Sequence, residues 1–96
     1  MILHIIKVIY IEDYKVEVSF NDGRKGVANL EAALHGPVFE PLKDKDLFSQ
    51  VKLDDSLNTI CWPNGADLAP EYVYFKAFCK VPELQTKFKE WGYLAS

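Results

Sequence analysis

The side chains that most often bind metals or act as nucleophiles are few and widely spaced in this chain. Its imidazole and thiol groups belong to His4, His35, Cys61 and Cys79. No two of them stand at the short spacing of a CxxC or HxxxH pair, which brings metal ligands together within one element. We therefore expect no metal site, and His4 is interpreted as an ordinary strand residue.

The glycines and the acidic residues form no catalytic pattern either. The five glycines make neither GxGxxG nor GxxxxGK[ST], the loops that hold nucleotide phosphates, so we expect no cofactor. Residues 12–13 and 54–55 are acidic pairs in predicted turns, where carboxylates are solvated rather than opposed across a cleft. Cys61 has apolar neighbours, which raise the pKa of a thiol. We expect no catalytic residues and predict that the protein is not an enzyme.

One segment stands out, residues 62–71 with the sequence WPNGADLAPE. A strand is expected to end at Trp62, a Pro-Asn-Gly turn reverses the chain, and Asp67 lies close enough to a helix start to bond its free N–H groups. In one interpretation this segment only shapes the fold, with Trp62 in the core. In the other, an aromatic ring, an amide and a carboxylate present a recognition surface.

The candidate interaction residues are therefore Trp62, Asn64, Gly65, Asp67, Glu71 and, near the C-terminus, Trp91. The apolar first strand is a further candidate surface. An alternative places a small-molecule pocket, for ligand binding or catalysis, near Trp62, Asn64 and Asp67.

The elements that must position these residues follow from hydrophobic periodicity and turn residues. Residues 14–20 alternate strictly between apolar and polar, which predicts a half-buried antiparallel strand. Residues 3–11 are apolar almost throughout, so we expect a strand covered on both faces or lying against a partner. A third strand is predicted over 24–28 after an Asn-Asp-Gly turn. These three strands form a meander.

The rest of the chain is predicted to be short elements. They are a helix over 30–35 capped by Asn29, an extended connection over 38–43, a helical turn capped by Asp44, a hairpin from 51–53 and 59–62, a helix over 70–80, and a last helix between Pro82 and Gly92. The predicted fold class is α+β: an antiparallel three-stranded meander plus a second hairpin, short helices between, and two C-terminal helices. We divide the chain into a single α+β domain, 1–80, and an amphipathic helical extension, 81–96.

Composition excludes several classes of protein. With 96 residues, 49% of them hydrophobic and 26% charged, the chain is predicted to be one small folded domain. A net charge of −3 with a single arginine argues against nucleic acid as the main partner. The most apolar stretch, 1–11, is far shorter than the about 20 residues of a membrane span. We expect a cytoplasmic protein whose two cysteines are buried free thiols.

Three patterns together resemble a known family. The run at 62–71, the FxPL pattern at 39–42 and the VxVxFxDG pattern at 16–23 are similar to the bacterial and archaeal domain of unknown function 2442. The resemblance covers roughly residues 4–78. It implies a small α+β domain, alone or fused to a helix-turn-helix domain, and often encoded beside a small partner in a pair reminiscent of toxin–antitoxin modules. Residues 79–96 lie outside it and are too short for a helix-turn-helix.

From these observations we expect a non-catalytic protein-interaction or regulatory module. The expected partner is the product of an adjacent gene, and in the most specific form of the hypothesis this chain is the neutralising member of the pair. Homo-oligomerisation stays open, because Trp91 and Tyr93 beyond Pro82 have the chemistry to cover either their own sheet or that of a second copy.

Overall fold

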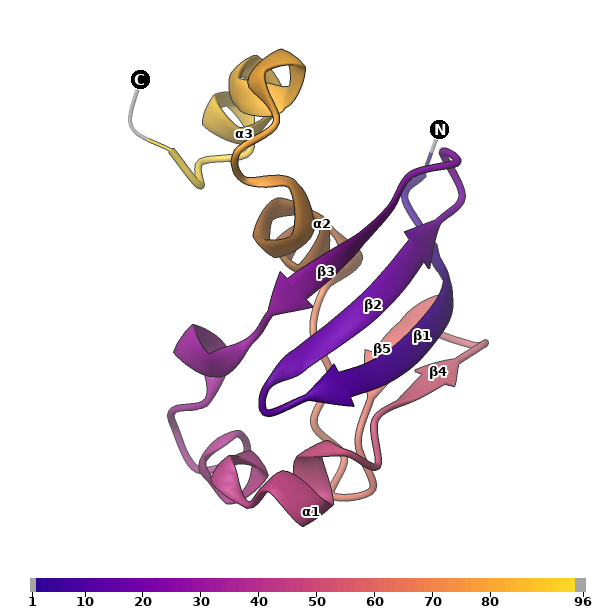
Figure 1. Cartoon of the computed structure of the whole chain (residues 1–96), viewed down its shortest axis with the longest axis vertical. Helices are drawn as coiled ribbons and strands as arrows, with labels where there is room; N and C mark the ends of the chain where they lie inside the picture. The colour runs from indigo at the N-terminus through magenta and orange to yellow at the C-terminus, as the bar shows by residue number, and fades with distance from the viewer. Residues whose placement is uncertain (1, 95–96) are drawn as a thin grey trace.

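A computed structural model describes residues 2–94 and contains a three-stranded antiparallel sheet, a separate hairpin and several short helices (Figure 1). The strands of the larger sheet are β1 (Ile5–Glu12), β2 (Lys15–Phe20) and β3 (Lys25–Asn29), in the order β1-β2-β3. Asp13 and Gly23 take positive φ angles in the two turns, as tight reversals require. The predicted α+β meander is confirmed. Residues 1 and 95–96, the ends of the apolar stretch and of the C-terminal extension, lie outside the described residues.

The second hairpin is also confirmed. It pairs β4 (Lys52–Asp54) with β5 (Thr59–Cys61). Both strands pack against β1, and they lie behind it in Figure 1. The backbone N–H of Ile5 donates to the carbonyl of Asn58 at 2.9 Å, which fixes the start of β1 to the hairpin turn.

The helical segments differ in places from their predicted form. They are the 3-10 turns η1 (Glu31–Ala33), η2 (Glu40–Lys43) and η3 (Pro82–Leu84), and the α-helices α1 (Lys45–Phe48), α2 (Pro70–Phe78) and α3 (Gln85–Glu90). The extended connection predicted over 38–43 is wrong, because Pro41 lies in the first turn of η2, which places Leu42 in the core. The helix predicted over 30–35 is a single 3-10 turn, although Asn29 does accept a hydrogen bond from the N–H of Glu31.

Helix α2 packs against β3, and one glycine makes this contact possible. A Cβ atom added at Gly26 would lie 2.6 Å from Cε1 of Phe78, closer than two non-bonded carbon atoms normally approach. Helix α3 continues beyond α2, at the end of the molecule opposite to α1 (Figure 1). The side chains of Leu84 and Phe88 in this C-terminal segment are buried in the core. The two predicted C-terminal helices are confirmed.

One hydrophobic core joins both sheets to α2 and α3. Its buried members include Ile5, Val16, Val18, Phe20, Ile60, Trp62, Val73, Tyr74, Phe78, Leu84 and Phe88. The residues from β2 are the ones predicted by strict alternation. Among residues 2–94, none of the helices has both the length and the apolar character needed to cross a bilayer.

Candidate functional site

Residues 62–66 form a turn, called here the Trp62 turn, which is held by buried contacts and internal hydrogen bonds. Trp62 is only 2% exposed, and its indole Nε1–H donates to the carbonyl of Phe48 at 2.9 Å. Gly65 has a φ of 89° and donates its N–H to the Trp62 carbonyl at 3.0 Å, while the Trp62 N–H donates to Ala66. Trp62 is therefore a core residue, as the structural interpretation of this segment expected.

Asn64 uses both ends of its amide inside the chain. Its Nδ2 donates to the Val38 carbonyl at 2.9 Å, and its Oδ1 accepts from the N–H of Ala66 at 3.1 Å. These bonds hold the turn against the segment before η2. The amide that was a candidate for binding a partner therefore already has partners.

Asp67 does not cap α2, so the predicted capping role is wrong. The residue before the helix is Ala69, which makes no side-chain capping bond, and Pro70 at the first helical position has no N–H to satisfy. Asp67 is exposed and forms an isolated β-bridge with Cys61. Glu71 is half-buried in the first turn of α2, where a carboxylate interacts favourably with the helix dipole.

Trp91 lies far from Trp62. It is 36% exposed and packs edge-on against Tyr74 and Phe88, with ring centroids 5.9 Å away in each case. Nζ of Lys87 lies 5.6 Å from the Trp91 ring centroid. Trp62 packs beside α1, and α1 and α3 lie at opposite ends of the molecule in Figure 1. The structure therefore does not bring the six candidate residues into one patch.

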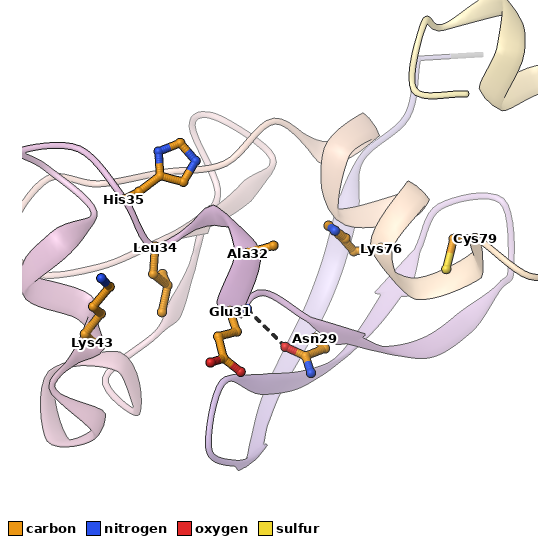
Figure 2. A pocket seen from close by; sticks show the side chains of 8 residues that line it. All are labelled: Asn29, Glu31, Ala32, Leu34, His35, Lys43, Lys76 and Cys79. Carbon is orange, nitrogen blue, oxygen red and sulfur yellow. Dashed lines mark hydrogen bonds between the residues drawn. The ribbon is translucent and has the colours of Figure 1, made fainter. Parts of the chain in front are cut away.

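An open groove of about 680 Å³ lies between η1 and α2 (Figure 2). Its lining residues are Asn29, Glu31, Ala32, Leu34, His35, Lys43, Lys76 and Cys79. None of the predicted site residues lines this groove. The sequence offered no signal for it, because its walls come from segments far apart in the chain.

The polar groups of this groove do not converge on one point. In Figure 2 the side chains of His35 and Glu31 point in opposite directions. Nζ of Lys43 bonds to Oε1 of Glu40 at 2.9 Å, and Nζ of Lys76 lies 5.7 Å from the centroid of the Tyr72 ring. Within residues 2–94, no three His, Cys, Asp or Glu side chains are placed to hold a metal ion. The polar side chains that line the groove therefore do not form a common binding or catalytic centre.

A polar network that sequence reasoning missed joins the β2–β3 turn to α2 and η3. The hydroxyl of Tyr74 donates to Oδ2 of Asp22 at 2.8 Å, and Arg24 lies 3.9 Å from that oxygen and 3.8 Å from Oε1 of Glu83. Burial and the hydrogen bond to the carboxylate raise the pKa of Tyr74 to about 12. The tyrosine therefore stays neutral and acts as a donor that holds the turn in place.

The two cysteines are free and differ in burial. Cys61 is buried, and this burial raises the pKa of its thiol, so it is not an activated nucleophile. Cys79 is only half-buried, at the edge of the groove. The expectation of two buried thiols is therefore correct for Cys61 and wrong for Cys79.

Strand β1 exposes isoleucine side chains. Ile6, Ile9 and Ile11 are 56%, 41% and 45% exposed. The expectation that this strand is covered on both faces is therefore wrong for the molecule by itself. The other alternative, that the strand lies against a partner, stays a prediction.

The strand register defines the outer face of the sheet. Val16, Val18 and Phe20 of β2 point to the core, so the residues of β2 between them point outward. Opposite these outward residues on β1 lie Lys7 (opposite Ser19), Ile9 (opposite Glu17) and Glu12 (opposite Lys15). In β3 the matching row contains Lys25, Val27 and Asn29. The sheet faces the viewer in Figure 1, and no helix crosses in front of it.

Comparison with known proteins gives one match. The model of a family described as a protein of unknown function (DUF2442) matches residues 5–78. No curated protein and no solved structure matches the chain. The matched region contains the whole sheet, the hairpin, the Trp62 turn and α2, and it ends before η3.

Proposed function

This chain belongs to the DUF2442 family, and we propose that it acts as a non-catalytic protein-interaction module. The observation that carries the proposal is strand β1, where three isoleucines of one strand are exposed and one of them, Ile9, lies on the outer face of the sheet. Scattered exposed apolar residues are ordinary on protein surfaces, but several on one uncovered strand are typical of a binding surface.

The physical reason is that a partner would gain free energy by covering these side chains. Burial of apolar surface contributes about 25 cal/mol per Å². An edge strand also presents unpaired backbone N–H and C=O groups, which another chain can bind by strand addition. Both contributions act at β1.

The proposed partner is the small protein encoded beside the gene for this chain, as the family resemblance implies. In its most specific form, this protein neutralises that partner in a two-gene pair. Exposed isoleucines on β1 suit this role, because they can pack on an active or toxic surface of the partner without a catalytic group.

The alternative function, a ligand-binding or catalytic pocket near Trp62, Asn64 and Asp67, has less support. Trp62 is buried, and the amide of Asn64 is bonded within the turn. The groove that does exist lies elsewhere and is lined by polar groups that point apart.

The test is capture of the adjacent gene product on co-expression with the tagged full chain. We expect the wild type to retain the partner and Ile9→Lys to lose it, since a charge on the outer side of β1 opposes its burial. Val38→Lys is a matched control, because Val38 is 50% exposed and lies outside the sheet. The proposal fails if the partner is not captured and growth is unaffected by expressing either gene.

A further inference from the structure

Strand β1 is one edge of the three-stranded sheet, and most of its outer edge is free. In the order β1-β2-β3, β1 pairs with β2 on one side only. Within residues 2–94, the backbone hydrogen bond that β1 makes outside the sheet is the one from Ile5 to Asn58, at the start of the strand. The edge from Lys7 to Tyr10 therefore has no backbone partner among the described residues.

A register shift gives β1 an unusual arrangement of charge. In a regular strand, residues two apart share a face, so Ile11 would follow Ile9 on the outer face and Glu12 would point inward. The shift between Tyr10 and Glu12 inserts one extra residue, so that Glu12 faces outward instead. Along the outer face, β1 therefore presents a cation, an isoleucine and an anion, namely Lys7, Ile9 and Glu12.

We propose that β1 binds β1 of a second copy of this chain in antiparallel orientation, centred on Ile9, so that the two sheets join into one. In this arrangement Ile9 faces Ile9 of the second copy. With Ile11 again as the extra residue of β1, each Lys7 lies opposite a Glu12, and this contact occurs twice because of the twofold symmetry. The inference deepens the proposed function and rests on it, because the joined sheet brings the exposed isoleucines of both copies together into one larger surface for the partner.

The charges favour a second copy over an unrelated strand. The order cation, isoleucine, anion is complementary to itself when reversed, which is what an antiparallel pair of identical strands requires. Opposite charges directly across from each other stabilise paired strands, whereas like charges destabilise them. Within residues 2–94, neither Lys7 nor Glu12 takes part in an ion pair within 4.0 Å, and the nearest opposite charge across the sheet is Lys15, which faces Glu12.

The test begins with the mass of the isolated full chain in solution. The monomer has a mass of 11.0 kDa. We expect sedimentation or light scattering to show a dimer at protein concentrations between about 1 μM and about 100 μM, the range of a micromolar Kd. A single monomeric species over this range overturns the proposal. If the monomer still captures the adjacent gene product through Ile9, the edge takes that protein instead, and the proposed function survives.

Charge reversal tests the register. Lys7→Glu and Glu12→Lys each replace two attractive pairs by two repulsive ones, so we expect each to weaken dimerisation by about tenfold to a hundredfold. The double variant Lys7→Glu/Glu12→Lys restores both pairs and should dimerise like the wild type. Mixing the two single variants should also give a heterodimer, which shows in addition that both are folded.

The matched control is Lys25→Glu, which reverses a charge in the same row of the outer face but on β3, at the other edge. We expect this variant to remain dimeric. Equal weakening by Lys7→Glu and Lys25→Glu, or no recovery in the double variant, overturns the proposed register. A dimer that behaves as expected but captures no partner supports this inference and counts against the proposed function.

Discussion

The Trp62 turn and strand β1 differ in how distinctive their sequences are and in how many of their side chains are left without partners. The turn has the most distinctive sequence in the chain, yet its indole and its amide are bonded to the protein itself. Strand β1 has an ordinary apolar sequence, yet it leaves three isoleucines exposed. A distinctive motif can therefore serve the fold, while a function is better sought where the fold leaves groups without partners. Three of the predictions below test this difference, and two concern the Tyr74 network.

The largest effect is expected at the turn. Trp62→Ala removes a buried indole and leaves the Phe48 carbonyl without its donor, so we expect a loss of about 3–5 kcal/mol in the free energy of unfolding. Trp91→Ala is the control, because this second tryptophan is partly exposed and should cost about 1 kcal/mol. Urea titrations measure both. Equal losses would mean that the two tryptophans do not differ as their burial indicates.

The second prediction concerns the Tyr74 network. Tyr74→Phe removes the hydrogen bond to the Asp22 carboxylate without changing the ring, so we expect a loss of about 1.5–3 kcal/mol. Tyr10→Phe is a control, since the Tyr10 hydroxyl bonds an exposed carbonyl in a turn. A Tyr74→Phe variant as stable as the wild type would show that this bond does not hold the turn.

The same variant has a pH dependence with a defined sign. The folded protein favours the neutral phenol of Tyr74, whose pKa is raised to about 12. Its contribution to stability is therefore complete below the ordinary pKa of 10.0 and is lost as the pH rises through about 12. We expect the stability difference between wild type and Tyr74→Phe to shrink across this window. A difference that stays constant in urea titrations across these pH values contradicts the assignment.

A smaller effect is expected at Asn64. Asn64→Ala removes an exposed hydrogen bond to Val38 and a partly buried one from Ala66, so we expect a loss of about 1–2 kcal/mol. Asn64→Asp keeps the acceptor and should fall between alanine and the wild type. Neither variant should change partner capture. If a variant lost partner capture while its stability stayed unchanged, the turn would be a recognition surface, as in the second interpretation of residues 62–71.

The smallest effect on stability is expected at β1. Ile9 is exposed, so Ile9→Lys should leave the free energy of unfolding within about 0.5 kcal/mol of the wild type. Association, measured by capture and by mass in solution, should nevertheless be lost. If Ile9→Lys unfolded more easily but still associated, Ile9 would serve the fold and not binding, which contradicts the role given to β1.

Much of the fold could be predicted because the relevant signals are local. Alternation in β2 identifies its buried side, and Gly23 and Asp44 mark a turn and a helix start. The 3-10 turn at Pro41 was missed because its short apolar pattern fits either an extended or a turned backbone. The candidate site could be predicted only in part, since whether Asn64 is free depends on Val38, which is distant in the sequence.

What the sequence determined by itself is the five strands and the C-terminal helices, their order, and the residues of β2 that form the core. These depend on neighbours in the chain, through side-chain alternation and backbone preferences. Only the tertiary structure decided the register of β1, which turns Glu12 outward, and the partial exposure of Ile9. Register and cover depend on how distant segments pair and pack, and a continuous apolar strand looks the same in sequence whether one face is buried or both.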